Sequence, residues 1–315
     1  MYKIEKSIEQ GFSGRPGGLF DILTQLQNGM FGMAGETYFV EGNVGSDASD
    51  GKSWDGAFKT LATAITASNA SIAHANKKGY AVRNAIFVRA DSITEDLTVP
   101  PSKCDVIGVG STDAHNMTEI KGEHSWTGSG TIMNTGWYNL CFVNDDASAI
   151  FTVATPAGLY YDGCLFRAEA DAIHAIHLTG ATGHDFTVNN CRFINDEYND
   201  RFATGAILNA VTTTYHNFAI TNSYLEGEYG IKIDTTNLYN AWINNCTVVA
   251  TGVTIDDNSD DCIVTNNTLI SEGDITTQSN CYDFLPAKAA NNVLTGDDAT
   301  VTIPTLSDLI TYSAG

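Results

Sequence analysis

The sequence predicts an all-β fold: a right-handed parallel β-helix, which is a solenoid of coils about 25 residues long, closed by an N-terminal capping α-helix. Three observations lead to this prediction. A short motif recurs along the chain, an asparagine stands at the centre of its clearest copies, and a segment with helical periodicity precedes the first copy. Such repeats indicate a solenoid because each repeat buries its apolar side only against its neighbours.

The repeated motif consists of an apolar residue, a variable residue, an asparagine, a small residue, a variable residue and a second apolar residue. The clear copies are DFTVNNCRF (185–193), FAITNSYL (218–225), AWINNCTV (241–248), DCIVTNNTL (261–269) and AANNVL (289–294). Weaker copies are LCFV (140–143) and GCLF (163–166). Successive small residues are 23, 27, 32, 23, 21 and 25 positions apart, at Cys141, Cys164, Cys191, Ser223, Cys246, Asn267 and Asn292. This variation favours coils with insertions over leucine-rich or propeller repeats.

The central asparagines predict a corner in each coil. Asparagine is the residue other than glycine that most readily adopts left-handed backbone dihedrals. Corners are therefore expected at Asn190, Asn222, Asn245, Asn266 and Asn291, with the flanking apolar residues and the small residue facing inward. Stacked coils then place the small residues above one another at the strand spacing of about 4.8 Å, where they form a ladder.

A further strand is expected in each coil after the corner. It follows a glycine in GAILN (205–209), GIKID (230–234), GVTID (252–256) and GDIT (273–276). Glycine supplies the permissive backbone that the turn before this strand needs. The remaining segments differ in length from coil to coil, as the insertions of a solenoid do.

The N-terminal part predicts a strand, a loop rich in glycine, aspartate and serine, and then a helix within residues 38–65. Ser53 is the expected N-cap, and one helical face carries Phe58, Leu61, Ala62 and Ile65. An amphipathic helix here would cover the open end of the solenoid. The chain thus divides into an N-terminal arm (1–35), a capping strand and helix (36–80), the β-helix (81–300) and a C-terminal tail or cap (301–315).

The start of the predicted β-helix resembles that of pectin-lyase-like right-handed parallel β-helix domains. The resemblance is carried by Tyr38-Phe39-Val40, Gly45-Ser46-Asp47, Gly51-Lys52-Ser53-Trp54 and Ala57-Phe58-Lys59-Thr60-Leu61, and it extends over residues 36–300. It implies the fold and leaves the activity open. That superfamily includes polysaccharide lyases and hydrolases, phage tailspikes and structural virion proteins.

Charge and cysteine content limit the partners and the compartment. The chain has 16 basic and 37 acidic residues, a formal net charge of −21, which disfavours nucleic acid and suits divalent cations, basic partners or neutral sugars. Its seven cysteines contain no CxxC pair, so we expect free buried thiols in a protein that folds in the cytoplasm. No apolar run is long enough for membrane insertion, and the N-terminus lacks the pattern of a secretory signal.

A carboxylate recurs three positions after the last apolar residue of six copies. These residues are Asp146, Glu169, Asp196, Glu228, Glu272 and Asp297, and Thr251 takes the place in the seventh copy. If the coils stack in register, the carboxylates form an acidic column along one edge. Such a column would bind cations such as Ca²⁺, which prefers oxygen ligands, or would splay into water as a series of solvated turns.

Catalytic candidates are sparse. Hydrolysis of a polysaccharide needs two carboxylates at a defined separation, and Asp196 and Glu228 on successive coils are the best pair. Tyr198 and Tyr215 lie in or near the longest insertion and are candidate sugar contacts. Lyase chemistry needs a base, for which Arg192 and Lys232 are candidates without a supporting motif. No organic cofactor is expected.

Two functions follow as expectations. The first is a non-catalytic structural protein of a tailed bacteriophage particle, such as a capsid decoration, a fibre or a tailspike-like module, that binds host surface glycans. It would assemble in the host cytoplasm and contact other virion proteins through residues 1–35, as a homotrimer or as a docked monomer. The alternative is an extracellular polysaccharide-degrading enzyme, either a tailspike depolymerase or a pectate-lyase-like lyase or hydrolase.

Overall fold

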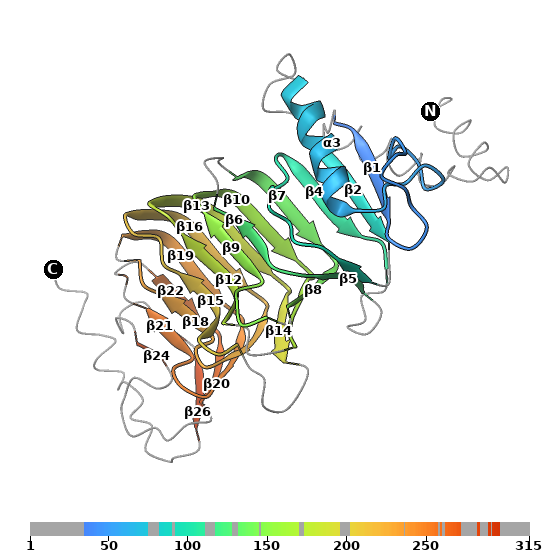
Figure 1. Cartoon of the computed structure of the whole chain (residues 1–315). Coiled ribbons are helices and arrows are strands. Elements are labelled where there is room, and N and C mark those ends of the chain that lie inside the picture. The colour runs from blue at the N-terminus through green and yellow to red at the C-terminus, as the bar shows by residue number, and fades with distance from the viewer. Residues whose placement is uncertain are drawn as a thin grey trace, which may run out of the picture.

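The computed structural model shows three long parallel β-sheets wound around a common interior (Figure 1). It describes residues 35–74, 82–89, 92–110, 117–127, 132–144, 146–169, 173–195, 202–235, 237–257, 259, 262–271, 282–283, 289–290 and 292–296. The predicted arm and C-terminal tail therefore lie almost wholly outside the described residues. Within the described residues no helix is long and apolar enough to span a membrane.

Sheet A is the longest of the three. Its strands, in spatial order, are β1 (Thr37–Glu41), β2 (Asn84–Arg89), β4 (Cys104–Gly108), β7 (Ile132–Tyr138), β10 (Pro156–Asp162), β13 (Thr182–Asn189), β16 (Thr214–Thr221), β19 (Leu238–Asn244), β22 (Cys262–Thr265) and β25 (Ala289–Ala290). Neighbours in this order are one coil apart in the chain and pair in parallel. This is the topology of a parallel β-helix.

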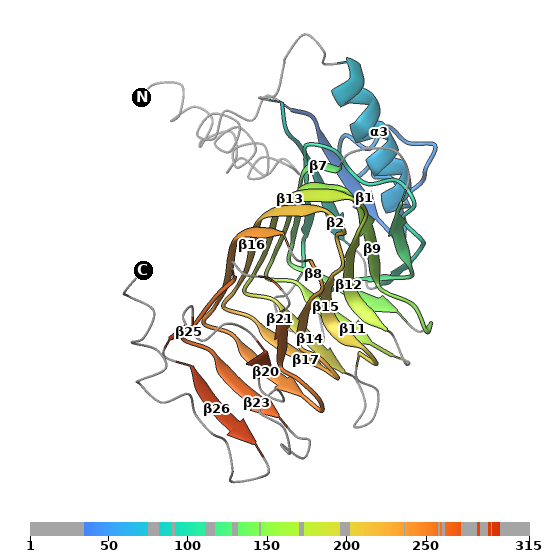
Figure 2. The ribbon, with the colours of Figure 1, turned by 90° about the vertical axis from the view of Figure 1, so that its left-hand side faces the viewer.

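Sheets B and C complete each coil. Sheet B contains β3 (Ser92–Thr94), β5 (Thr118–Lys121), β8 (Leu140–Asn144), β11 (Leu165–Ala168), β14 (Arg192–Asn195), β17 (Tyr224–Gly227), β20 (Thr247–Ala250), β23 (Thr268–Ser271) and β26 (Val293–Gly296). Sheet C contains β6 (His124–Trp126), β9 (Phe151–Ala154), β12 (His174–Thr179), β15 (Gly205–Asn209), β18 (Ile231–Ile233), β21 (Ile255–Asp257) and β24 (Tyr282–Asp283). Figure 2 shows the three sheets facing one another around the interior.

The corner between sheets A and B is formed by the predicted asparagines. Asn190, Asn222, Asn245 and Asn266 all have φ between 52° and 57°, so each occupies the left-handed region. The fifth predicted corner, Asn291, lies outside the described residues. Inside the corner, side chains accept hydrogen bonds from the backbone of the preceding coil: Ser223 Oγ from Cys191 N at 3.1 Å and Asn267 Oδ1 from Cys246 N at 2.8 Å. The predicted ladder of small residues is confirmed for these coils.

One coil is displaced by one residue from the predicted alignment. Leu165 pairs with Cys141, so Cys164 is in line with Leu140, and Leu140 takes the inward position that was assigned to Cys141. Cys141 instead packs outside sheet B in a second apolar cluster with Met117, Val143 and Leu165. The alignment was wrong because residues on both faces of β8 are apolar and buried, so the pattern there does not distinguish the faces.

The interior is filled by stacked apolar side chains, since like residues of successive coils lie over one another. Phe166 and Phe193 stack with ring centroids 4.5 Å apart and planes 2° apart, and Phe186 stacks on Phe218 at 5.2 Å. Each such ring is fully buried. These columns bind each coil to the next one, and they hold the outward residues of the same strands at fixed spacing.

Helix α3 (Leu61–His74) lies beside β1 and β2 at the N-terminal end of the stack (Figure 1). It begins later than predicted, and Thr60 rather than Ser53 is its N-cap, since Thr60 Oγ1 accepts from Thr63 N at 3.3 Å. Glu95 adds a second cap from a distant loop, accepting from Leu61 N at 2.8 Å and Ala62 N at 3.1 Å. Ser53 Oγ accepts from Gly56 N within the loop.

The glycine- and aspartate-rich loop before α3 has a structural role. Asp47 Oδ1 accepts from Lys59 N and Thr60 N, both at 2.9 Å, and so fixes the chain just before the helix. Gly51 has φ of 68°, and a Cβ there would lie 2.1 Å from the Phe58 ring. The motif that carried the family resemblance is thus accounted for by local folding.

Candidate functional site

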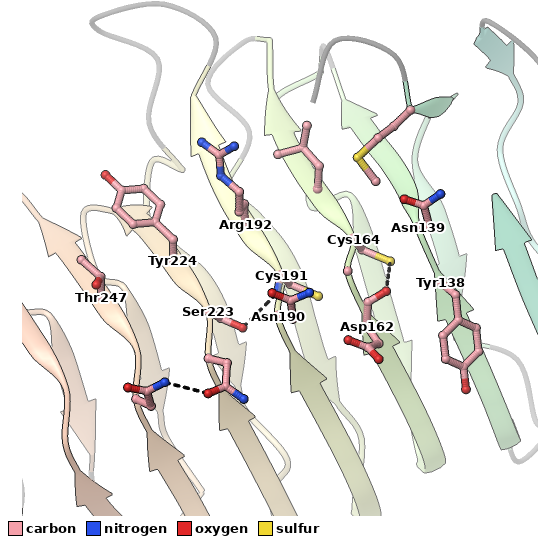
Figure 3. Close-up of a pocket in the computed structure, with 15 residues that line it drawn as sticks. Tyr138, Asn139, Asp162, Cys164, Asn190, Cys191, Arg192, Ser223, Tyr224 and Thr247 are labelled. Atoms are coloured by element: carbon pink, nitrogen blue, oxygen red, sulfur yellow. Dashed lines mark hydrogen bonds between the residues drawn. The ribbon is translucent and has the colours of Figure 1, made fainter. Parts of the chain in front are cut away.

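A groove follows the outer side of the corner between sheets A and B (Figure 3). It has a volume of about 570 Å³ and crosses successive coils rather than following one strand. The lining residues come from the ends of sheet A strands, the corners and the starts of sheet B strands: Met117, Tyr138, Asn139, Asp162, Gly163, Cys164, Leu165, Asn190, Cys191, Arg192, Asn222, Ser223, Tyr224, Asn245 and Thr247. The site therefore exists only when several coils have stacked.

A relay of side-chain amides runs along this groove. Asn245 Nδ2 donates to Asn222 Oδ1 at 2.7 Å, and Asn222 Nδ2 donates to Asn189 Oδ1 at 2.8 Å. Asn189 Nδ2 then donates to Asp162 Oδ1 at 3.0 Å. Tyr160 donates its hydroxyl to Asp162 Oδ2 at 3.3 Å. The relay orients each amide, and it leaves lone pairs and N–H groups at the surface for a hydroxyl-rich ligand.

Aromatic and cationic side chains border the relay. Tyr138 stands at one end of the groove, and burial is the main cause that raises the pKa of its hydroxyl, with the Asp105 carboxylate adding to the effect. Arg192 and Tyr224 begin neighbouring strands of sheet B and lie in register. Arg192 is exposed, and the Tyr224 hydroxyl donates to Glu226. The groove thus offers two ring faces and one guanidinium beside the amides.

Cys191 and Cys246 place buried thiols at this corner. Burial raises the pKa of the Cys191 thiol well above its ordinary value, and burial raises that of Cys246, one position beyond Asn245, to about 11. Both thiols also hydrogen-bond to backbone carbonyls, such as Asn189 O and Asn244 O. A protonated, carbonyl-bonded thiol is a poor nucleophile and a poor metal ligand at neutral pH. These cysteines serve the corner rather than a reaction.

The predicted acidic column is only partly present in the described residues. Glu169 is ion-paired with both Lys121 and Arg167 at 2.8 Å, and the hydrogen bond from Lys121 is the largest cause of its lowered pKa. Glu228 is exposed. Asp146 lies one residue beyond the register of Glu169, because Ala168 pairs with Asn144. Asp196, Glu272 and Asp297 lie outside the described residues.

The sugar-contact candidates have different outcomes. Tyr215 is 0% exposed and packs edge-on against Phe218 in the interior, so the prediction that it contacts a surface sugar was wrong. It precedes a left-handed bend at Asn217, and the bend puts Tyr215 on the inner face, which the sequence pattern did not reveal. Tyr198, like Asp196 of the predicted carboxylate pair, lies outside the described residues.

No group of three or more His, Cys, Asp or Glu side chains that could hold a metal ion occurs within the described part of the chain.

The groove and one exposed tryptophan were not predicted from the sequence. Trp242 is 58% exposed on the outer face of sheet A. The signal was available, since Ala241 and Ile243 on either side are buried and a strand alternates its faces. The groove had no such signal, because its walls combine residues 130 positions apart, from Met117 to Thr247.

No family model, curated protein or solved structure matches this chain significantly. The chemistry of the site must therefore be argued from its geometry. Among the described residues that line the groove, Asp162 is the one carboxylate, and it already accepts two hydrogen bonds. Amides, hydroxyls and ring faces predominate, and this set suits reversible binding of a neutral polar ligand better than acid–base chemistry.

Proposed function

We propose that this chain is a non-catalytic structural protein of a tailed bacteriophage particle that binds host surface glycans through the groove at the corner of sheets A and B. The particle role covers a capsid decoration, a fibre or a tailspike-like module. In this proposal the β-helix is right-handed and of the pectin-lyase-like kind, its coils average about 25 residues, and α3 caps its N-terminal end.

The amide relay from Asn245 to Asp162 is the observation that carries the proposal. Sugars present many hydroxyl groups, each of which both donates and accepts, and a row of oriented amides offers both partners at regular spacing. The coil spacing of about 4.8 Å sets that regular spacing. Tyr138 and Tyr224 add ring faces on which the C–H side of a sugar can stack.

The particle role is supported by how the molecule is built. Continuous ladders and stacked rings give a stiff body whose surface sites need no ordering on binding, which favours affinity. The free, buried thiols fit assembly in a reducing cytoplasm. Residues 1–35 would dock the body onto other virion proteins, as a homotrimer or as a monomer.

The test is a binding and cleavage assay on one panel of bacterial capsular and lipopolysaccharide glycans, with and without Ca²⁺. We expect saturable binding without new reducing ends or unsaturated uronate absorbance. Arg192→Ala and Tyr224→Ala should each weaken binding several-fold, since both side chains border the groove, and Lys59→Ala on an exposed site at the far end should not.

Cleavage products would replace this proposal with a depolymerase, and mutagenesis of Asp196 and Glu228 would follow. Absence of binding across the panel would remove the glycan-binding part. The particle role is tested separately, by asking whether the full chain and a chain without residues 1–35 are incorporated into phage particles in an infected host. Equal incorporation would contradict the docking role of the arm.

A further inference from the structure

A column of outward residues on sheet A has large aromatic residues at two positions and small residues between them. The strand register aligns Tyr160 of β10 with Thr187 of β13, Thr187 with Ala219 of β16, and Ala219 with Trp242 of β19. Three coil spacings of about 4.8 Å separate the two aromatic residues, a span of about 14 Å. Between the two aromatic residues the outward side chains are small, and we call this strip of sheet A the trough.

Fixed polar side chains border this trough on both sides. On one side, Asn240 Nδ2 donates to Asn217 Oδ1 at 3.2 Å, and Asn217 Nδ2 donates to Asp185 Oδ1 at 2.6 Å. Asp185 and both asparagines adopt positive φ, so the strands bend here and project these groups outward. On the other side Thr221 Oγ1 donates to Asn189 Oδ1 at 3.0 Å.

The trough continues into the corner groove. Asn189 belongs to the amide relay and donates to Asp162, which lines the groove, while Tyr160 donates to the same carboxylate. The row of residues that includes Asn189 and Thr221 is therefore a shared wall, with the groove on one side and the trough on the other. A ligand in the groove that carries a side branch would extend the branch over this wall onto sheet A.

We propose that Tyr160, Thr187, Ala219 and Trp242 form a second glycan-contacting surface, which takes a neutral sugar branch between the two rings and determines which glycans bind. This inference rests on the proposed glycan-binding function and adds the specificity of that site. Trp242 provides a ring face that is 58% exposed, and the amide and hydroxyl borders bind the equatorial groups of a stacked sugar.

The charge at the trough selects against acidic sugars. Its described borders carry two carboxylates, Asp162 and Asp185, while His184 and His216 are the basic side chains beside them. His184 Nδ1 is already hydrogen-bonded to Asp185 at 2.8 Å. A uronate or a phosphorylated sugar would meet repulsion here, whereas a neutral hexose or N-acetylhexosamine would not.

A second copy of the chain is the competing occupant. Trp242 is followed in the column by Ile263, which is 40% exposed, and Tyr239 nearby is 41% exposed. An interface between copies would use all three apolar groups together. A sugar site between Tyr160 and Trp242 would not use Ile263, because Ile263 lies on the far side of the tryptophan. This difference provides a matched control.

The experiment measures binding of neutral oligosaccharides built from glucose, galactose, mannose, rhamnose and N-acetylhexosamines, with matched uronate-containing oligosaccharides as the acidic probes. Iodide quenching of tryptophan fluorescence is the second readout, since Trp126 and Trp137 are buried, Trp54 is half-buried and Trp242 is accessible. The Trp242→Ala variant gives the quenching that is due to Trp54 alone. We expect neutral probes to bind and to shield Trp242 from iodide. Trp242→Ala should weaken binding about tenfold, the effect of losing roughly one stacked ring.

Ala219→Leu is the sharper variant, because it fills the trough and removes no contact group. It should weaken binding of the same neutral probes as strongly as Trp242→Ala, and Ile263→Ala should leave binding unchanged. Circular dichroism of each variant verifies the fold. Loss in Trp242→Ala and Ala219→Leu with retention in Ile263→Ala supports the proposal, and equal binding of acidic and neutral probes overturns the charge selection.

Groove variants separate this inference from the function on which it rests. If Arg192→Ala weakens binding and neither trough variant does, the trough proposal is overturned while groove binding stands. If the trough variants weaken binding and Arg192→Ala does not, the trough stands without the groove. No binding of any neutral probe overturns the trough proposal, and no binding of any probe, neutral or acidic, overturns both. Self-association in sedimentation velocity that is lost in both Trp242→Ala and Ile263→Ala overturns the trough in favour of an interface between copies.

Discussion

At the residue scale, Asn222 illustrates how one side chain stabilises the corner. Its φ of 52° places the backbone in the left-handed region, which costs most residues about 1–2 kcal/mol. Its amide donates to Asn189 on one neighbouring coil and accepts from Asn245 on the other. The same residue therefore satisfies a backbone requirement and links three coils.

Replacement of Asn222 should separate these two contributions. Asn222→Gly loses the two side-chain hydrogen bonds but adopts the left-handed backbone without strain. Asn222→Ala loses the hydrogen bonds and is also strained in that backbone conformation, so we expect it to be less stable than the glycine variant by about 1–2 kcal/mol. Urea unfolding followed by circular dichroism measures the difference. Asn237→Ala is the control, since Asn237 donates one hydrogen bond, to Thr213 O, without a positive φ. Equal stability of the glycine and alanine variants would contradict the backbone argument.

His124 makes the stability of the coil interior depend on pH. It is fully buried between Phe142 and Phe151, its Nδ1 accepts from Leu97 N at 3.2 Å, and burial lowers its pKa to about 3. In the unfolded chain the histidine pKa is about 6.5. The folded state therefore binds fewer protons between these values, and its stability is lost as pH falls below about 6.5.

We expect the free energy of unfolding to fall between pH 7 and pH 4, with His124 contributing a slope of up to about 1.4 kcal/mol per pH unit. His124→Phe removes this titration, so its curve should be flatter, although the lost acceptor for Leu97 N lowers its stability at pH 7. His216→Phe, at an exposed histidine, is the matched control for the substitution itself. A wild-type slope in His124→Phe would show that His124 is not the titrating group.

At the scale of elements, α3 depends on a cap that comes from another part of the chain. Glu95 accepts from the first two amides of the helix, and burial raises the pKa of its carboxyl. Glu95 is 34 residues away from Leu61, so no local pattern could reveal it. Ser53 was predicted as the N-cap because it lies in the loop next to the helix.

Removal of the Glu95 side chain should destabilise α3 more than the rest of the molecule. Glu95→Ala should cost about 1–2 kcal/mol, because two helix N–H groups lose their partner and the helix dipole loses an anion. Hydrogen exchange of the α3 amides and urea unfolding measure this cost. Glu123→Ala, at an exposed glutamate, should leave both unchanged. If Glu95→Ala does not accelerate exchange in α3, the cap is not stabilising.

The difference between local sequence patterns and contacts between distant residues also explains which features of the coils could be predicted. Corners at Asn190, Asn222, Asn245 and Asn266 were predictable because left-handed dihedrals are a local property of asparagine. The position of Cys141 was not, because it lies in an outer apolar cluster that has the same composition as the interior. The proposed binding surfaces depend on register between coils: Tyr160 and Trp242 are 82 residues apart in sequence, and only three strand pairings bring them into one column.

At the scale of the whole molecule, charge opposes the compact state. The chain carries 37 acidic and 16 basic residues, and stacking brings successive coils to about 4.8 Å from one another. Local ion pairs offset part of this repulsion, as at Arg167, which contacts both Glu119 and Glu169 at 2.8 Å on the outer face of sheet B. These three side chains are 18–26% exposed, and an ion pair near the surface contributes only about 0–1 kcal/mol. The excess of 21 negative charges is therefore mostly uncompensated.

Salt should consequently raise the melting temperature rather than lower it. The screening length falls from about 30 Å at 0.01 M to about 10 Å at 0.1 M, so repulsion between distant carboxylates weakens while contacts such as Lys121–Glu169 at 2.8 Å change less. Thermal unfolding in NaCl from 10 to about 300 mM measures this effect, and a falling melting temperature would show that attractive pairs dominate.

Thermal unfolding in CaCl₂ at equal ionic strength tests whether the predicted acidic column binds Ca²⁺. A saturable rise beyond that in NaCl would show that Ca²⁺ binds the folded chain, because a ligand that binds only the native state stabilises it in proportion to its occupancy.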